Sequence, residues 1–242
     1  MRIFERIYIN SAKPLPKNYR EGFKKLMMYA GIRDESDIYL GKAVLLGLLA
    51  AAIVIQSPKA VFGLYKPVYI IAAVLAFLFV QIIAYLRIFF KAEERSKKVE
   101  NALPDAFQLI AANLRSGMTP FKALKQAAHE NLGPLQEEIT YATSRALGTE
   151  YFSETLLRIS DRIKSDLLER SLHLFTTAMR SGGNLAQVLE ELATDISETQ
   201  ALKRELRTST KTYTAFIMFT IIFGTPLLLA ISVNFVKMIS AM

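Results

Sequence analysis

The side chains most able to do acid–base or metal chemistry in this sequence are few and poorly placed for it. His129 and His173 are the only two histidines, and neither has a second ligand at metal-binding spacing or a serine and acid partner in a recognisable motif. The chain has no cysteine, which excludes disulfides, thiolate metal sites and thiol catalysis. We therefore interpret both histidines as helix-surface or packed residues, and we expect no catalytic and no metal site.

Two pairs of adjacent carboxylates, Glu137–Glu138 and Glu190–Glu191, are the remaining candidates for acid–base work. Neighbouring residues on an α-helix point about 100° apart, so the members of each pair do not face each other. Solvated helix faces explain them better than catalysis. The Gly-Lys of Tyr39–Val44 lacks the upstream glycine and the hydroxyl of a phosphate-binding loop. We therefore expect no cofactor and predict that the protein is not an enzyme.

One short motif, Arg-Ser-Gly, occurs twice with similar flanks, in NLRSGMT and AMRSGGN. The copies lie 65 positions apart, and their residues are Arg115, Ser116, Gly117, Arg180, Ser181 and Gly182. Glycine suits the left-handed end of a helix, and the preceding arginine meets the negative end of the helix dipole. The motif is either a helix stop that arose twice or part of a duplicated unit. If the duplication brings both helix ends to one side of the bundle, the arginines form a paired basic edge for an acidic partner. The alternative is that each arginine only complements the dipole of its own helix.

The helices that must position these turns are predicted by a repeated apolar spacing between residues 103 and 200. Five segments carry apolar residues at positions 0, 4, 7 and 11, starting at Leu103, Leu135, Phe152, Leu168 and Leu185. The first stripe, Leu103 to Leu114, recurs 65 residues later from Leu168 to Met179. Helix boundaries are marked by Thr119-Pro120, Gly133-Pro134, Gly148-Thr149, Ser165-Asp166 and Asn184. We predict about six short helices in an antiparallel bundle that contains a duplicated unit.

Three apolar segments are predicted to cross a membrane. Residues 67–86 and 213–236 carry no charge over 20 and 24 residues, which is long enough for the roughly 30 Å hydrocarbon layer. Residues 43–55 reach spanning length when the segment begins at Ile38 and Lys42 extends to the interface. Gly224-Thr225-Pro226 predicts a kink at Gly224 and Pro226, either a packing feature or a flexing joint. The N-terminus lacks the apolar core of a cleavable signal peptide, so none is expected.

Lysine and arginine are unevenly distributed around these spans, and the sparse side carries only Lys59, Lys66 and Lys237. The positive-inside bias predicts a cytoplasmic segment at 1–37, a two-span hairpin at 38–90, a cytoplasmic helical domain at 91–211 and a third span with a short outer tail at 212–242. Residues 91–211 contain 17 basic and 17 acidic side chains. The net charge of +8 therefore belongs to membrane-flanking positions and does not indicate nucleic-acid binding.

These features predict an all-α integral membrane protein with three transmembrane helices and a cytoplasmic six-helix bundle inserted before the last span. The segments LPDAFQLIAANLRSGMTPFKALKQAA and LFTTAMRSGGNLAQVLEELA resemble the F domain of type II secretion and type IV pilus machines, the cytoplasmic part of their membrane platform protein. The likeness covers residues 95–236 and is closer to the archaeal and tight-adherence branch. Family members commonly have a fourth span or a second F domain, so we expect a minimal, split or shortened member.

The resemblance implies a platform function in the cell membrane, that is, the inner or cytoplasmic membrane. The domain is then expected to dock a hexameric secretion ATPase, while the spans guide pilin-like subunits from the lipid bilayer into a growing filament. It also implies a homo-oligomer, dimer or trimer. The alternative is a membrane subunit of a transporter or permease. That alternative is less favoured because the predicted spans contain no Asp or Glu to relay protons or bind a cation.

Overall fold

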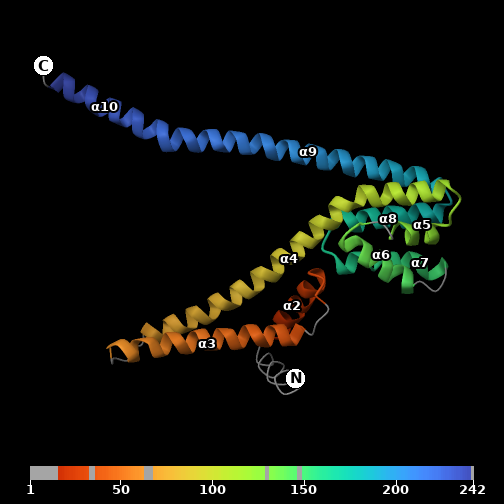
Figure 1. Ribbon diagram of the computed structural model, residues 1–242, viewed down its shortest axis with the longest axis horizontal. Helices are drawn as coiled ribbons and strands as arrows, with labels where there is room; N and C mark the ends of the chain where they lie inside the picture. Colours follow the sequence, from red (N-terminus) through yellow and green to blue (C-terminus); the bar gives the residue numbers. More distant parts are fainter. Residues whose placement is uncertain (1–15, 33–35, 63–67, 129–130, 146–148, 241–242) are drawn as a thin grey trace. The chain divides into compact units, whose positions relative to one another are not determined.

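The computed structural model describes residues 16–32, 36–62, 68–128, 131–145 and 149–240. Within these ranges the regular structure is entirely helical, which confirms the predicted all-α class (Figure 1). The elements are α2 (Lys17–Tyr29), α3 (Ser36–Phe62), α4 (Val68–Arg115), α5 (Pro120–Ala127), α6 (Pro134–Arg145), α7 (Thr149–Leu157), η1 (Ser160–Arg162), α8 (Asp166–Ser181), α9 (Leu185–Phe219), η2 (Thr220–Gly224) and α10 (Thr225–Ser240). The chain divides into two compact units, Met1–Glu190 and Glu191–Met242.

Helices α3 and α4 pack against each other as a hairpin (Figure 1). Gly47 of α3 approaches α4 so closely that a Cβ atom would lie 2.8 Å from the Phe77 ring and 3.3 Å from the Gln81 amide nitrogen. A small residue at a crossing lets two apolar helices approach closely in a membrane. The outward sides of both helices carry exposed large apolar side chains, among them Leu46, Leu49, Ile53, Ile70, Leu75 and Phe79. An apolar surface of this extent suits contact with lipid.

Within the described residues, three helices are long and apolar enough to cross a membrane. They contain the candidate spans Ile38–Gln56, Tyr69–Arg115 and Leu185–Ser240. Each includes one of the three apolar segments predicted from the sequence. The prediction of three candidate spans is therefore confirmed by length and composition.

Helix α2 was not anticipated within the N-terminal segment 1–37. It packs against the start of α3 and the middle of α4, in a cluster formed by Phe23, Leu26, Met27, Ala30, Leu40, Ile88 and Ala92. Its buried residues are only a few and lie within two turns, too short a pattern to stand out in the sequence. Burial against the hairpin stabilises the helix, because a helix of 13 residues is marginal by itself.

The prediction that the domain begins with a short helix is wrong. Helix α4 runs unbroken from Val68 to Arg115, through the end of the second apolar segment and through Pro104. Proline inside a helix removes one backbone hydrogen bond and clashes with the preceding turn, which costs about 3 kcal/mol. The flanking residues Leu103 and Phe107 are nearly fully buried, so tertiary packing outweighs this local cost. The last helix is also longer than predicted, since α9 continues from Leu185 to Phe219.

Around the C-terminal half of α4 pack α5, α6 and α8, and α7 packs between α6 and α8. The residues that fill this core include, on the predicted apolar stripes, Leu103, Phe107, Ile110, Leu135, Ile139, Phe152, Leu156, Leu168, Leu172, Phe175 and Leu189. Leu124, the counterpart of Leu189 in the first copy, is buried with them. The spacing in the sequence therefore identified which face of each helix is buried. It did not identify where the first helix begins or where the last helix ends.

In the second unit, residues 191–240 form one nearly continuous helix, and those beyond Ser197 are almost all exposed. Residues 220–224 form a π-helical turn, η2, and the Thr225 N–H bonds to the Thr220 carbonyl. Pro226 follows as the second residue of α10. Figure 1 shows the helix changing direction where α9 gives way to α10, at the predicted kink. A π-helical turn absorbs the backbone register that proline disturbs, so the helix bends without breaking.

Candidate functional site

The two Arg-Ser-Gly turns end two helices in the same way. Helix α4 ends at Arg115 and α8 ends at Ser181. Gly117 and Gly182 follow with φ angles of 86° and 65°. Both glycines therefore adopt the left-handed conformation that the sequence predicts for a helix C-terminus.

The likeness of the two turns extends to the helices that follow them. The Thr119 hydroxyl accepts a hydrogen bond from the Lys122 N–H at 3.4 Å, and the Asn184 side-chain oxygen accepts one from the Gln187 N–H at 3.3 Å. These N-caps lie 65 positions apart, as the motifs do. Buried residues correspond at the same offset in the pairs Leu103 and Leu168, Phe107 and Leu172, Ile110 and Phe175, and Leu124 and Leu189. The two segments therefore share backbone conformation and buried positions.

The arginines of the two turns differ in their surroundings. Arg115 donates to the Glu190 carboxylate at the start of α9. Glu190 belongs to the second copy, and the residue 65 positions earlier, in the first copy, is Lys125. The position equivalent to that of Glu190 therefore offers Arg180 a lysine instead of a carboxylate. The two arginines are both exposed, but the charge of Arg115 is neutralised in part by Glu190.

The interpretation of both residues of the Glu137–Glu138 pair as a solvated face is wrong for Glu138. Its side chain is 1% exposed, whereas that of Glu137 is 67% exposed. Because neighbouring helix residues point about 100° apart, one faces water and the other faces the core. A buried carboxylate is costly unless it is paired and hydrogen-bonded.

Two arginines supply that pairing, and we call Arg95, Glu138 and Arg162 together the Arg95 junction. Arg95 Nη2 lies 2.7 Å from Glu138 Oε1, and Arg162 Nε lies 2.7 Å from Glu138 Oε2. The Arg162 contact is not aligned as a hydrogen bond, so we treat it as a charge contact only. The Arg95 contact is a charge-assisted hydrogen bond in a buried site.

Arg95 also reaches two backbone carbonyls. Its Nη1 atom donates to the Arg162 carbonyl at 3.4 Å and to the Tyr29 carbonyl at 3.5 Å, both long hydrogen bonds. The side chain is only 9% exposed. It therefore lies where α2, α4, α6 and η1 meet. Arg95 lies close after the second apolar segment, where a basic residue is expected to flank the membrane, yet it falls in register on the buried stripe of α4.

On the outer side of the same turns of α4, the charged residues behave differently. Lys97 pairs with Glu93 at 3.4 Å and Lys98 pairs with Glu94 at 2.7 Å. The hydrogen bond from Lys98, together with its charge, lowers the pKa of the Glu94 carboxyl below its ordinary value. These are exposed pairs within one helix, which contribute little stability. On neighbouring turns of α4, Lys97 and Lys98 thus form exposed pairs within the helix, whereas Arg95 forms a buried pair with another helix.

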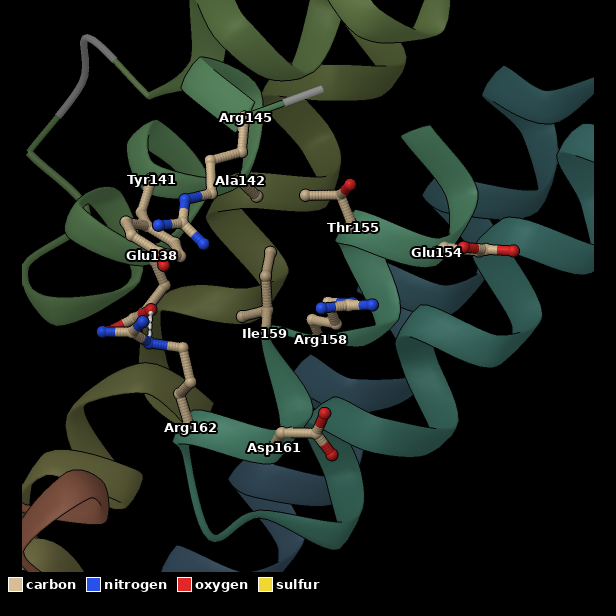
Figure 2. Close-up of a pocket in the computed structure, with 10 residues that line it drawn as sticks. All are labelled: Glu138, Tyr141, Ala142, Arg145, Glu154, Thr155, Arg158, Ile159, Asp161 and Arg162. Atoms are coloured by element: carbon tan, nitrogen blue, oxygen red, sulfur yellow. Dashed lines mark ion pairs between the residues drawn. The ribbon is translucent and has the colours of Figure 1, made fainter. Parts of the chain in front are cut away.

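A groove of about 420 Å³ opens beside Glu138, between α6, α7 and η1 (Figure 2). The guanidinium carbons of Arg162 and Arg145 lie 4.3 Å and 4.8 Å from the centre of the Tyr141 ring. Figure 2 shows the Arg158 guanidinium on the opposite side of Ile159, so the arginines do not converge on one point. This arrangement provides charge–aromatic stacking rather than a pocket for a single anion.

Other candidate chemical groups remain apart. His173 is exposed on α8, and His129 lies outside the described residues. In the part of the chain that the structure describes, no group of three or more His, Asp or Glu residues could hold a metal ion. The Ser116 and Ser181 hydroxyls bond to backbone carbonyls of their own helices, those of Asn113 and Thr177. The structure thus brings together Arg95, Glu138 and Arg162, which the sequence analysis did not connect.

Comparison with known proteins identifies a family. Residues 106–233, more than half of the chain, match the family model of protein F of the type II secretion system (T2SS). No curated protein and no solved structure matches the chain. The matched region contains both Arg-Ser-Gly turns, Glu138, Arg162 and the predicted kink, whereas Arg95 precedes it.

Proposed function

Because the chain belongs to the family of type II secretion system protein F, we propose that it is the membrane platform of a type IV pilus-like or type II secretion machine. In this role it couples a cytoplasmic secretion ATPase hexamer to the assembly of pilin-like subunits. It works as a scaffold in the cell membrane, as a dimer or trimer, and catalyses no reaction itself.

The observation that supports this proposal best is the continuity of its helices. The family match covers the helical domain and the last apolar segment together. Helix α4 runs from the apolar segment at its start to the first Arg-Ser-Gly turn, and α9 runs from the second turn toward η2 and α10. A continuous helix transmits displacement along its axis, because its backbone hydrogen bonds link each turn to the next. Two such helices suit a protein that carries movement between a cytoplasmic motor and a bilayer.

The membrane orientation is proposed from charge, with the helical domain in the cytoplasm. Because the chain has no cysteine, single cysteines introduced at Gly63 and Gln136 can be labelled individually. An impermeant maleimide added to intact cells should label Gly63→Cys and spare Gln136→Cys until the membrane is opened. External labelling of Gln136→Cys would contradict both the orientation and ATPase docking.

The function itself is tested with the full chain in membranes. A detergent extract of tagged chain should retain the secretion ATPase encoded with it, and deletion of the gene should abolish filaments or secretion while the subunits accumulate in the membrane. The purified chain should not hydrolyse ATP. If deletion instead removes uptake or export of a small solute and leaves filaments intact, the transporter alternative is correct.

A further inference from the structure

We propose that the Arg95 junction fixes the helical domain to the base of the membrane hairpin and that movement of the domain reaches α3 and α4 through it. The first half of this inference stands on the contacts within the first unit. The second half rests on the proposed function. Arg95 is then a positioning residue, since it acts by holding other elements in place.

The position of Arg95 on α4 is the first observation that supports the inference. The buried stripe of this helix runs through Ile88, Ala92, Arg95, Val99 and Leu103 with helical spacing. The first two residues pack in the cluster formed with α2 and α3. The last two belong to the part of α4 that is covered by the helical domain. Before Arg95, the buried stripe of α4 packs against α2 and α3, and after Arg95 it packs against the helical domain. Arg95 lies between these two parts of the stripe.

The contacts of the Arg95 guanidinium group are the second observation. One nitrogen, Nη2, binds Glu138 on α6, and the other, Nη1, faces the carbonyls of Tyr29 in α2 and Arg162 in η1. Only arginine offers several donors in one rigid plane, so a single side chain can bind three segments at once. The backbone beside it is fitted to the guanidinium, because a Cβ atom on Gly31 would lie 2.8 Å from Arg95 Nε.

A second set of contacts on α4, at Ser96 next to Arg95 and at Glu100 five residues beyond it, supports the same attachment. The Ser96 hydroxyl donates to the Lys164 carbonyl, and the Ser165 hydroxyl donates to Glu100 Oε1 at 2.6 Å. Both join α4 to the segment between η1 and α8. The Lys164 ammonium also lies 5.5 Å from the Phe89 ring, on the hairpin side of Arg95. The segment that follows η1 is therefore bonded to α4 on both sides of the junction.

Burial makes the attachment resistant to sliding. Glu138 is 1% exposed, so moving α6 away from α4 separates a carboxylate from its guanidinium in a place that water does not reach. The loss is large because Arg95 then loses its buried carboxylate and its charge-assisted hydrogen bond, while Glu138 keeps only the charge contact with Arg162. An exposed pair can exchange its partner for water during the same movement. The domain and the hairpin base are thus expected to move together.

The first test measures the attachment directly and needs no ATPase. Lys24 on α2 and Thr140 on α6 are exposed, and the chain has no native cysteine. Spin labels on Lys24→Cys and Thr140→Cys in the full chain should give one narrow distance distribution by double electron–electron resonance. Adding Arg95→Gln or Glu138→Gln should broaden that distribution. Arg115→Gln changes another arginine of α4 and removes its exposed pair with Glu190 of α9. This variant should leave the distance distribution narrow.

The second test measures coupling in cells that carry the ATPase and its filament subunits. Arg95→Gln and Glu138→Gln should lose filament assembly while the chain stays in the membrane and still retains the ATPase. Arg95→Lys keeps a cation beside Glu138 but lacks the planar fork, so it should recover assembly in part. Lys98→Gln, which removes only the exposed pair with Glu94 on α4, is the matched control and should retain ATPase binding and assembly.

The outcomes separate the inference from the proposed function. Unchanged distances in both junction variants would show that the domain is not fixed through Arg95, and the inference would be wrong. Normal assembly in these variants would refute the coupling route even if the distances broaden. Simultaneous loss of membrane content, ATPase retention and assembly would also overturn it, since the junction would then only maintain the fold. A wild-type chain that never binds the ATPase contradicts the proposed function and leaves the distance test valid.

Discussion

Two arginines of α4 each meet a glutamate from another helix, and the two pairs differ mainly in burial. At the junction, Arg95 is 9% exposed and Glu138 is 1% exposed. At the turn, Arg115 is 63% exposed and Glu190 is 35% exposed. The same pair of side chains is therefore a buried joint between elements in one place and a surface contact in the other. Coulomb attraction at the surface is screened by water and salt, whereas a buried charge without its partner is strongly unfavourable.

The largest effect is expected from removing the buried carboxylate. Glu138→Ala leaves Arg162 without its ion-pair partner and leaves Arg95 with only the exposed Glu137 carboxylate at 3.9 Å, so the free energy of unfolding should fall by about 3–5 kcal/mol. Chemical unfolding of the full chain in detergent measures this change. Glu137→Ala, next in sequence but exposed, is the matched control and should cost less than about 1 kcal/mol. Equal costs for the two variants would show that burial does not distinguish them.

The next effect concerns the glycine that lies against Arg95. Gly31 has a φ of +73°, and a Cβ atom there would contact the guanidinium group. Gly31→Ala combines backbone strain with displacement of Arg95 and should cost about 2 kcal/mol or more. Gly117→Ala has the same backbone strain but no atom within 4 Å of its Cβ, so it should cost about 1 kcal/mol. Unfolding of both variants under the same conditions provides the comparison, and a larger loss at Gly117 would contradict it.

A smaller effect tests whether the two turns are equivalent. Gly117→Val and Gly182→Val place a β-branched residue at φ angles of 86° and 65°, and no neighbouring atom obstructs either Cβ. Each substitution should destabilise the chain by about 1–2 kcal/mol through backbone strain alone. Melting temperatures of the two variants should fall by similar amounts. A fall at only one position would refute equivalent roles for the two turns.

The smallest effect on stability is expected at the exposed arginines. Arg115→Gln removes the pair with Glu190 and should cost about 0.2–1 kcal/mol, a loss that disappears in high salt. Arg180→Gln should cost no more. If the two arginines form a basic edge for the ATPase, the double variant Arg115→Glu with Arg180→Glu should lose ATPase retention without loss of helicity. Normal retention in the folded double variant would remove both residues from the interface.

Much of the local structure could be predicted because it depends on neighbours in sequence. The ends of α4 and α8 follow from Gly117 and Gly182, and the N-caps follow from Thr119 and Asn184. The buried face of each helix follows from apolar spacing. The prediction failed where a distant contact decides the outcome. Pro104 does not break α4, because the residues on both sides of it are held in the core.

The sequence by itself determined the all-α class, the three apolar spans, the two left-handed turns and the likeness to the family of protein F. The class, the apolar segments and the turns depend on the order of residues within a helix or at its end, and the likeness depends on the order of motifs along the chain. Only the tertiary structure decided that Glu138 is buried while Glu137 is exposed, and that Arg95 is its partner from a helix 43 residues earlier. The sequence alone does not distinguish a glutamate that faces water from one that faces a buried counter-charge. The difference arises from desolvation, which depends on how separate helices pack together.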